Sequence, residues 1–210
     1  MKKRAILFAN GQVTEREVSI ARGIGFDLVV AADGGIVNAE RFDLVPNIVV
    51  GDFDSLPENS RTLFPEIHFV HRPSQDQCDL EKALIHCEKE QITAITLLGA
   101  TGKRPDHTLG NLSLLTRYDR HFQIRTLTPE AEVFIVRDHL ELEGMPGQGV
   151  SLVPIGEARL VTTTGLKYPL TGETLAFGKR EGTSNEFSSH RCSVSLESGL
   201  LIVFHLYPEI

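Results

Sequence analysis

The stretch PNIVVGDFDSLPE, residues 46–58, joins a short apolar run directly to two aspartates. The apolar residues 48–50 are consecutive and do not alternate with polar ones, which indicates a strand buried on both faces. Such strands occur in parallel sheets whose two faces are covered by helices. The stretch therefore predicts an α/β fold, with Asp52 and Asp54 placed just beyond the end of a strand.

The same pattern recurs over the first 120 residues, where the apolar runs RAILFAN, FDLVVAAD, EIHFVHR and ITAITLLGA alternate with segments of helical character. From about residue 122 it changes to short β-type runs separated by turn residues, from FQIRTL to LLIVFHLYP. Such runs predict an antiparallel sandwich or barrel. We therefore expect an α/β protein: an N-terminal parallel-sheet domain over residues 1–120, followed by an antiparallel β-sandwich domain over residues 121–210.

The composition limits what the chain does. Its 210 residues carry a formal net charge of −7, and its lysines and arginines are scattered, so nucleic-acid binding is not expected. The apolar run near the N-terminus is about five residues long, whereas a signal peptide needs roughly 7–15 and a membrane span about 20. The three cysteines form no CxxC pair. We expect a cytoplasmic protein with reduced cysteines and no membrane segment.

Aspartates follow two of the expected strands. Asp33 comes after LVVAA and before Gly34, and Asp52 and Asp54 come after NIVVG. If the chain stays extended through Phe53, the side chains of Asp52 and Asp54 point the same way. Taken singly, each aspartate is better explained as a turn or helix-capping residue. Three of them at equivalent strand ends favour a site, because paired carboxylates are what Mg²⁺ requires.

A third acidic segment is RPSQDQCDLEKAL, in which Ser74 and Gln77 predict a helix that starts with a capping box. Asp76 would then lie in the first turn and Asp79 one turn further on, with Lys82 three residues beyond. Helix-dipole complementarity and an ion pair explain these charges by themselves. Their position beyond another expected strand favours a site instead.

The segment LLGATGKRPDHTLGNLSLL combines a glycine-containing loop, which starts at Gly99, with two cations, Lys103 and Arg104. A helix is expected to begin near Pro105 or Asp106. Glycine and a helix N-terminus favour an anion such as phosphate. The loop is not a Walker A loop, because too few residues separate its glycines and an arginine follows the lysine.

These strand-end segments together surround one expected crevice. Its carboxylates would repel one another unless cations neutralised them, and Mg²⁺ with a bound polyphosphate supplies that balance. The residues alone therefore predict Mg²⁺-dependent chemistry on a nucleotide polyphosphate. The candidate residues of the crevice are Asp33, Asp52, Asp54, Asp76, Asp79, Lys82, Lys103, Arg104, Asp106 and His107. His107 shares a helix face with Asn111, and a structural role explains it as well as a functional one.

These motifs resemble those of the thiamin pyrophosphokinase family over nearly the whole chain. The matching segments are DGG at 33–35, GDFDS at 51–55, DQCDLEKAL at 76–84, GKRPDHTLGN at 102–111, GLKYPL at 165–170 and GTSNEF at 182–187. The resemblance implies an α/β catalytic domain, a β-sandwich thiamin-binding domain, and a homodimer with active sites between subunits. It also implies transfer of the diphosphoryl group of ATP to the hydroxyl of thiamin, which gives thiamin diphosphate and AMP.

The resemblance further implies roles for single residues. Those implied to hold Mg²⁺ and to orient the phosphates are Asp52, Asp54, Asp76 and Asp79; catalysis is implied to rest on these four with Lys82, Arg104 and Asp106. Those implied around the nucleotide also include Asp33, Gly34, Gly99, Lys103, His107 and Asn111. Those implied to line the thiamin pocket are Tyr168, Thr183, Ser184 and Asn185. Asp79 is our hypothesis for the base that takes the proton of the thiamin hydroxyl, and a metal-ligand role fits it equally well.

The sequence departs from the family pattern at two positions. Lys103 stands where a second glycine is common, and Tyr168 stands where some members carry Trp. Two other functions remain open. A Mg²⁺-dependent phosphohydrolase or nucleotidyltransferase acting on a nucleotide polyphosphate fits the strand-end aspartates equally well. A non-catalytic sensor of thiamin or nucleotide fits less well, because a binding module has no need of so many desolvated carboxylates.

Overall fold

The computed structural model describes residues 3–54 and 64–208 of the chain. The chain divides into two compact units, Met1–Pro129 and Glu130–Ile210. Residues 55–58, at the end of the stretch that predicts the fold, lie outside the described ranges. None of the helices within these ranges is both long and apolar enough to cross a membrane.

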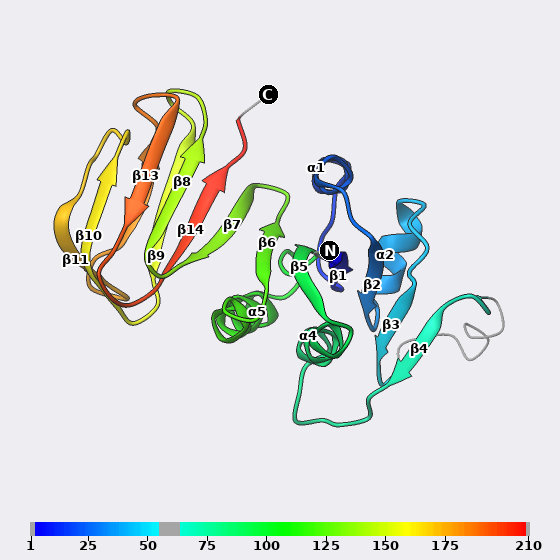
Figure 1. Cartoon of the computed structure of the whole chain (residues 1–210). Helices are drawn as coiled ribbons and strands as arrows, with labels where there is room; N and C mark the ends of the chain where they lie inside the picture. Colours follow the sequence, from blue (N-terminus) through cyan, green and yellow to red (C-terminus); the bar gives the residue numbers. More distant parts are fainter. Residues whose placement is uncertain (1–2, 55–63, 209–210) are drawn as a thin grey trace. The chain divides into compact units, whose positions relative to one another are not determined.

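The first unit is built on parallel strands in the order β6-β5-β1-β2-β3-β4 (Figure 1). The strands are β1 (Lys3–Phe8), β2 (Leu28–Ala32), β3 (Ile48–Gly51), β4 (His68–His71), β5 (Ile92–Leu98) and β6 (Gln123–Leu127). In the centre of the sheet, Ala5 lies opposite Leu28 on one side and Ile95 on the other. The parallel sheet that the consecutive apolar residues predict is thus confirmed.

Helices cover both faces of this sheet. They are α1 (Glu15–Ile24), α2 (Gly35–Arg41), α4 (Asp79–Lys89) and α5 (Pro105–Tyr118), and Figure 1 shows α1 above the strands with α4 and α5 below. One hydrophobic cluster joins α1 and α2 to the sheet through Val18, Ala39 and Phe8. Helix α4 packs on β2, β3 and β5. Burial of each large side chain contributes about 1.5–3 kcal/mol, so the helices are held mainly by these apolar faces.

The direction of the chain reverses at β1, which lies between β2 and β5. From β1 the chain moves toward β4 on one side, and later returns to β5 and β6 on the other. Open parallel sheets bind their ligands at such a reversal, in the crevice beyond the carboxyl ends of the strands. The loops that follow β1 and β5 therefore lie where a ligand is expected.

The strand β6 corrects one expectation. We expected FQIRTL to open the antiparallel part of the chain, but Ile124 pairs with Ile95 of β5 in parallel, so β6 belongs to the first unit. The short β-type run looks the same in either setting, because the local sequence does not record which partner a strand finds. The helix α5, by contrast, begins at Pro105 as expected.

The second unit is an antiparallel sandwich, as the turn-rich sequence predicts. One sheet has the order β12-β9-β14-β7 and the other β11-β10-β13-β8. A cluster that includes Leu152 and Val203 from the first sheet and Val161 and Val194 from the second fills the space between them. The strands are β7 (Ala131–Val136), β8 (His139–Glu143), β9 (Gly149–Pro154), β10 (Glu157–Thr164), β11 (Thr171–Ala176), β12 (Gly182–Glu186), β13 (Arg191–Ser195) and β14 (Leu201–Leu206).

Candidate active site

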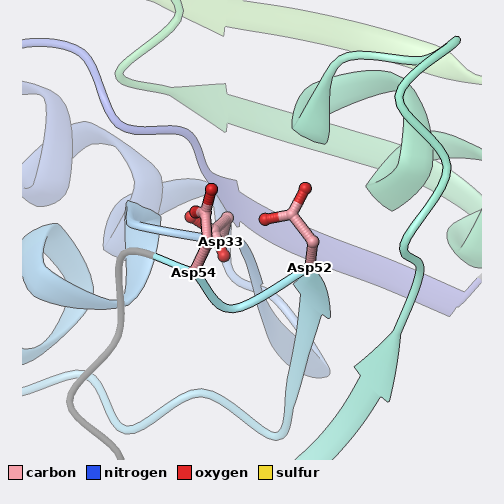
Figure 2. A group of neighbouring side chains, drawn as sticks. All are labelled: Asp33, Asp52 and Asp54. Carbon is pink, nitrogen blue, oxygen red and sulfur yellow. The ribbon is translucent and has the colours of Figure 1, made fainter.

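Three carboxylates meet beyond the ends of β2 and β3. Oxygen atoms of Asp33, Asp52 and Asp54 all lie within 4.8 Å of one another. Figure 2 shows Asp52 and Asp54 on the short segment after β3, with their side chains on the side where Asp33 lies. Hard oxygen ligands at this spacing suit Mg²⁺, so the three residues fit the metal that the sequence predicts.

The backbone that brings these carboxylates together is not extended. Phe53 has a φ of 65° and Asp33 a φ of 41°, both in the left-handed region that few residues other than glycine adopt. The Phe53 amide donates a hydrogen bond to Asp33 Oδ1 at 3.2 Å, which links the two strand ends. A Cβ atom at Gly51 would lie only 2.5 Å from that same oxygen, so this approach requires glycine.

The ring of Phe53 points into the hydrophobic packing and forms an edge-on contact with Phe69 at a centroid distance of 5.7 Å. Asp52 and Asp54 therefore share a side, as expected, although the chain between them bends and does not continue the strand. The sequence could not show this bend, because a non-glycine residue at positive φ is held by tertiary contacts.

A buried lysine joins the carboxylates to helix α4. Lys82 is 3% exposed, and its Nζ donates hydrogen bonds to Asp52 Oδ2 at 2.9 Å and Asp79 Oδ1 at 3.0 Å. Burial by itself lowers the pKa of Lys82, but the two hydrogen bonds outweigh it and leave that pKa raised. The pKa of Asp52 is lowered, chiefly by its hydrogen bond to Lys82. The lysine and Asp52 are thus a stable ion pair at neutral pH.

Asp79 differs from Asp52 although both bond to the same lysine. Burial raises the pKa of Asp79 and outweighs the contact with Lys82, which lowers that pKa; the charges of Asp33 and Asp52 add smaller contributions to the rise. A carboxylate whose pKa is raised accepts a proton more readily than an ordinary one. This raised pKa suits the base that the sequence analysis hypothesises for Asp79.

The start of helix α4 corrects a second expectation. The helix begins at Asp79 with Cys78 in the N-cap position, and not at Ser74. Ser74 Oγ instead accepts a hydrogen bond from the Asp76 amide at 3.2 Å in a local turn, a geometry that competes with a capping box. Asp76 consequently lies in the loop before the helix, where it lines a cavity with Asp79.

Two adjoining cavities occupy the sheet's reversal point. The larger, about 390 Å³, is lined by the loop before α4 and by Lys82; the smaller, about 190 Å³, is lined by Gly99, Lys103 and Arg104. Both are also lined by Asn10, His107 and Asn111. An elongated ligand that fills both cavities would reach from Asp76 and Asp79 to the two cations, which suits a nucleotide with a chain of phosphates.

The two residues at the start of helix α5 form an exposed ion pair. Arg104 donates to Asp106 through Nε at 3.1 Å and through Nη2 at 2.5 Å. This bidentate contact lowers the pKa of Asp106 to about 2, so its carboxylate stays charged. Asp106 lines a separate groove between α4 and α5, and of the pair only Arg104 lines the smaller cavity.

The sequence analysis missed Asn10 and Gly11, which line the smaller cavity. Asn10 Oδ1 accepts a hydrogen bond from Lys103 Nζ at 2.9 Å. The signal was present, because Asn10 ends the apolar run RAILFAN and residues after such runs lie at the ligand end of the sheet. A single uncharged side chain at a strand end is, however, a weaker signal than paired carboxylates.

The four expected thiamin residues lie together in the second unit. Tyr168 is 60% exposed, with Lys167 Nζ 5.6 Å from its ring centroid, and Thr183 and Ser184 are exposed on β12. Asn185 is 7% exposed, and its amide both accepts from the Tyr168 backbone N–H at 3.1 Å and donates to the Tyr168 carbonyl at 2.7 Å. Asn185 thus fixes the backbone that presents the tyrosine ring.

The fold and the first unit's site define a class: an α/β protein with strand-end carboxylates beside a cavity suited to a phosphorylated ligand. The chain also matches two domain descriptions, "Thiamin pyrophosphokinase, catalytic domain" over residues 25–127 and "Thiamin pyrophosphokinase, vitamin B1 binding domain" over residues 138–201. The chain belongs to the thiamin pyrophosphokinase family and is therefore an enzyme of the transferase class.

Individual relatives agree with this assignment. The thiamine pyrophosphokinase of Bacillus subtilis (strain 168) is 31% identical over 195 residues, which cover 86% of this chain and 84% of that protein. Thiamin pyrophosphokinase 1 of Caenorhabditis elegans is 32% identical over 193 residues, which cover 84% and 78%. The crystal structure of the Bacillus subtilis enzyme superposes with a TM-score of 0.85 at 26% identity, covering 99% of this chain and all of that one (100%).

Proposed function

We propose that this chain transfers the diphosphoryl group of ATP to the hydroxyl of thiamin, giving thiamin diphosphate and AMP. The observation that carries the proposal is that both domain descriptions match in one chain, while the first unit holds an acidic cluster that Lys82 joins to one of two adjoining cavities, the other of which is lined by two cations. A hydrolase or nucleotidyltransferase would share the acidic cluster, but it would not require the second matched domain.

The nucleotide is proposed to bind along the two adjoining cavities. Lys103 and Arg104 attract its phosphates at one end, and the glycine loop after β5 lets the backbone approach them. At the other end, Asp33, Asp52 and Asp54 offer the oxygen ligands for Mg²⁺, and Asp76 and Asp79 from the neighbouring loop and helix are the further candidates. When bound, Mg²⁺ neutralises phosphate oxygens and makes the phosphorus more electrophilic.

The chain's own residues supply the remaining chemistry. Lys82 holds Asp52 and Asp79 in fixed positions, so little reorganisation is needed when substrate binds. Arg104 balances negative charge that develops on the transferred group and on the departing AMP. Asp79 takes the proton from the thiamin hydroxyl as its oxygen attacks the β-phosphorus, a role that its raised pKa supports.

Thiamin is proposed to bind at the Tyr168 face of the second unit, where an aromatic ring offers stacking to the cationic thiazolium. We further propose a homodimer in which this face of one subunit completes the catalytic unit of the other. Sedimentation of the wild type tests the dimer. Mixing Asp79→Asn with Tyr168→Ala tests sharing of the site, because activity regained on mixing requires contributions from two chains.

The deciding assay follows AMP and thiamin diphosphate with ATP, Mg²⁺ and thiamin, supplied separately and together. The proposal expects both products only in the complete mixture and none with Asp52→Asn or Asp54→Asn. AMP release that ignores thiamin would favour the hydrolase instead, and binding of both ligands without product would favour a sensor. The predicted cytoplasmic location stays a prediction, which fractionation of cells would test.

A further inference from the structure

The loop after β1, residues 9–12, is fastened to the loop after β5. The Gly11 amide donates a hydrogen bond to the Gly99 carbonyl at 2.7 Å, and the Gln12 amide donates to the Thr101 carbonyl at 2.7 Å. These bonds continue the β1–β5 pairing past the end of the sheet, into the walls of the cavities. One side of the loop is therefore held by backbone alone.

A buried side chain holds the other side. Asn38 of helix α2 is 8% exposed, and its Nδ2 donates to the Ala9 carbonyl at 2.8 Å and to the Gly11 carbonyl at 3.0 Å. A buried carbonyl such as that of Ala9 is costly to leave without a donor, so this amide stabilises the observed conformation of the loop. The residue between the two carbonyls is Asn10.

Asn10 is presented by this loop at the junction of the two cavities. Its Oδ1 accepts the hydrogen bond from Lys103, which orients the amide and leaves Nδ2 as a donor. A Cβ atom at Gly34 would lie 2.6 Å from that Nδ2, so the amide rests against a position where any side chain would displace it. Asn111, also at the junction, already uses its Nδ2 on the Ala100 carbonyl at 2.9 Å.

We propose that Asn10 contacts the polyphosphate of the nucleotide, and that Asn38 is a positioning residue that acts through it. A phosphate chain that runs from Asp76 and Asp79 to Lys103 passes the junction, where the Asn10 amide offers an N–H donor to an anionic oxygen. Lys103 stands where the family commonly has a glycine. Its hydrogen bond to Asn10 places the Lys103 ammonium group beside the same phosphate path. This inference rests on the proposed function, since it takes ATP as the ligand.

The test measures nucleotide binding without turnover. Wild type, Asn10→Ala, Asn38→Ala and the double variant are titrated calorimetrically with α,β-methylene-ATP and Mg²⁺ in the absence of thiamin. We expect Asn10→Ala to raise the Kd about tenfold. Asn38→Ala should raise it by a similar factor, and the double variant should bind no more weakly than the weaker single variant, because both changes remove one contact.

The matched control is Asn47→Ala. Asn47 is an exposed residue directly before β3, at the amino ends of the strands and so at the end of the sheet away from the cavities. Its Oδ1 accepts a hydrogen bond from the Val29 amide at 2.8 Å. Its loss should lower the Tm but leave the nucleotide Kd within twofold, which separates positioning from general stability. If Asn38→Ala does not fold, Asn38→Ser, which keeps one short donor, takes its place and should give an intermediate Kd.

The outcomes are distinct. An Asn10→Ala variant that binds the analogue within twofold of wild type overturns the contact role of Asn10. Additive effects in the double variant overturn the positioning role of Asn38. A wild-type protein that does not bind the analogue at all contradicts the proposed function itself. An unchanged KM for thiamin in every variant that folds supports an effect confined to the nucleotide side.

Discussion

Lys82 of helix α4 donates a hydrogen bond of 2.9 Å to Asp52, which follows strand β3, and the lysine is nearly inaccessible to solvent. The contact joins two segments of the first unit that are thirty residues apart in the chain. Because Lys82 also bonds to Asp79, one cation sets the positions of two candidate catalytic carboxylates. Lys82 therefore neutralises carboxylates inside the protein. This role explains the presence of a lysine in the DQCDLEKAL motif without any contact between that lysine and phosphate.

Replacing Lys82 with Met should therefore damage both stability and catalysis. The variant leaves two carboxylates without a counter-charge, and removal of one partner from a buried ion pair costs about 3 kcal/mol of unfolding free energy. Misplaced carboxylates should lower kcat on the order of 10²-fold. Urea denaturation and thiamin diphosphate formation measure the two effects. The control is Lys89→Met, which changes an exposed lysine on the same helix. Equal stability and equal kcat in the two variants would refute the role of Lys82.

Asp79→Asn should abolish turnover far more than nucleotide binding. The amide keeps the size of the side chain but cannot accept a proton, whereas nucleotide phosphates do not depend on that proton transfer. We expect kcat to fall by about 10²–10⁴-fold, with the Kd for α,β-methylene-ATP changed much less. Near-normal turnover would remove Asp79 from the mechanism. A large loss of Mg²⁺-dependent nucleotide binding would instead assign it as a metal ligand.

Asp33→Asn tests whether the buried aspartate belongs to the metal cluster. Asparagine tolerates the left-handed backbone at this position but lacks the negative charge. The affinity for Mn²⁺, a spectroscopically visible substitute, should fall at least about tenfold in titrations followed by electron paramagnetic resonance. Asp43→Asn is the control, because Asp43 is also an aspartate at positive φ but is exposed. Equal Mn²⁺ affinities would place the metal elsewhere.

Acid should weaken the first unit through His86. Burial lowers the pKa of this residue, which stacks with His68, lies 4.0 Å from Glu90 and feels the charges of Arg72 and Lys89. A lowered pKa in the folded state means that the unfolded state binds more protons, so stability is complete above the unfolded pKa of about 6.5. It is then lost as the pH falls through the lower, folded value.

The wild-type Tm should accordingly drop more between pH 7.5 and pH 5.5 than that of His86→Gln. Circular dichroism at both pH values measures the difference. His190→Gln, which changes an exposed histidine of the second unit, should keep the wild-type pH dependence. Parallel Tm curves for wild type and His86→Gln would show that burial of this histidine does not govern the acid response.

Substitution of Tyr168 tests the surface of the second unit at which thiamin is proposed to bind. Tyr168→Ala removes the exposed ring and should raise the KM for thiamin about tenfold with little effect on that for ATP, whereas Tyr168→Phe keeps the stacking surface and should resemble wild type. Phe177→Ala is the matched control, because Phe177 is an equally exposed aromatic residue of the same unit. A thiamin KM unmoved by Tyr168→Ala would place the acceptor elsewhere.

Much of the fold was readable from local pattern. Consecutive apolar residues such as 48–50 predict a strand buried on both faces, and the turn-rich second half predicts the sandwich. The start of α5 at Pro105 could also be predicted from the local sequence, because proline suits the first turn of a helix. The start of α4 could not be predicted from the local sequence. The Ser74 side chain, which suggested a capping box, bonds to the Asp76 amide in a turn that lies before the helix.

The sequence by itself determined the two-part architecture, the carboxylates at the strand ends and, through ordered motifs, the family. Only the tertiary structure decided that β6 joins the parallel sheet, that Phe53 bends the chain between its two aspartates, and that Lys82 is buried against them. The reason is physical. Periodicity and capping act within a few residues, whereas strand partners, left-handed backbone and buried ion pairs are fixed by groups that are distant in the chain.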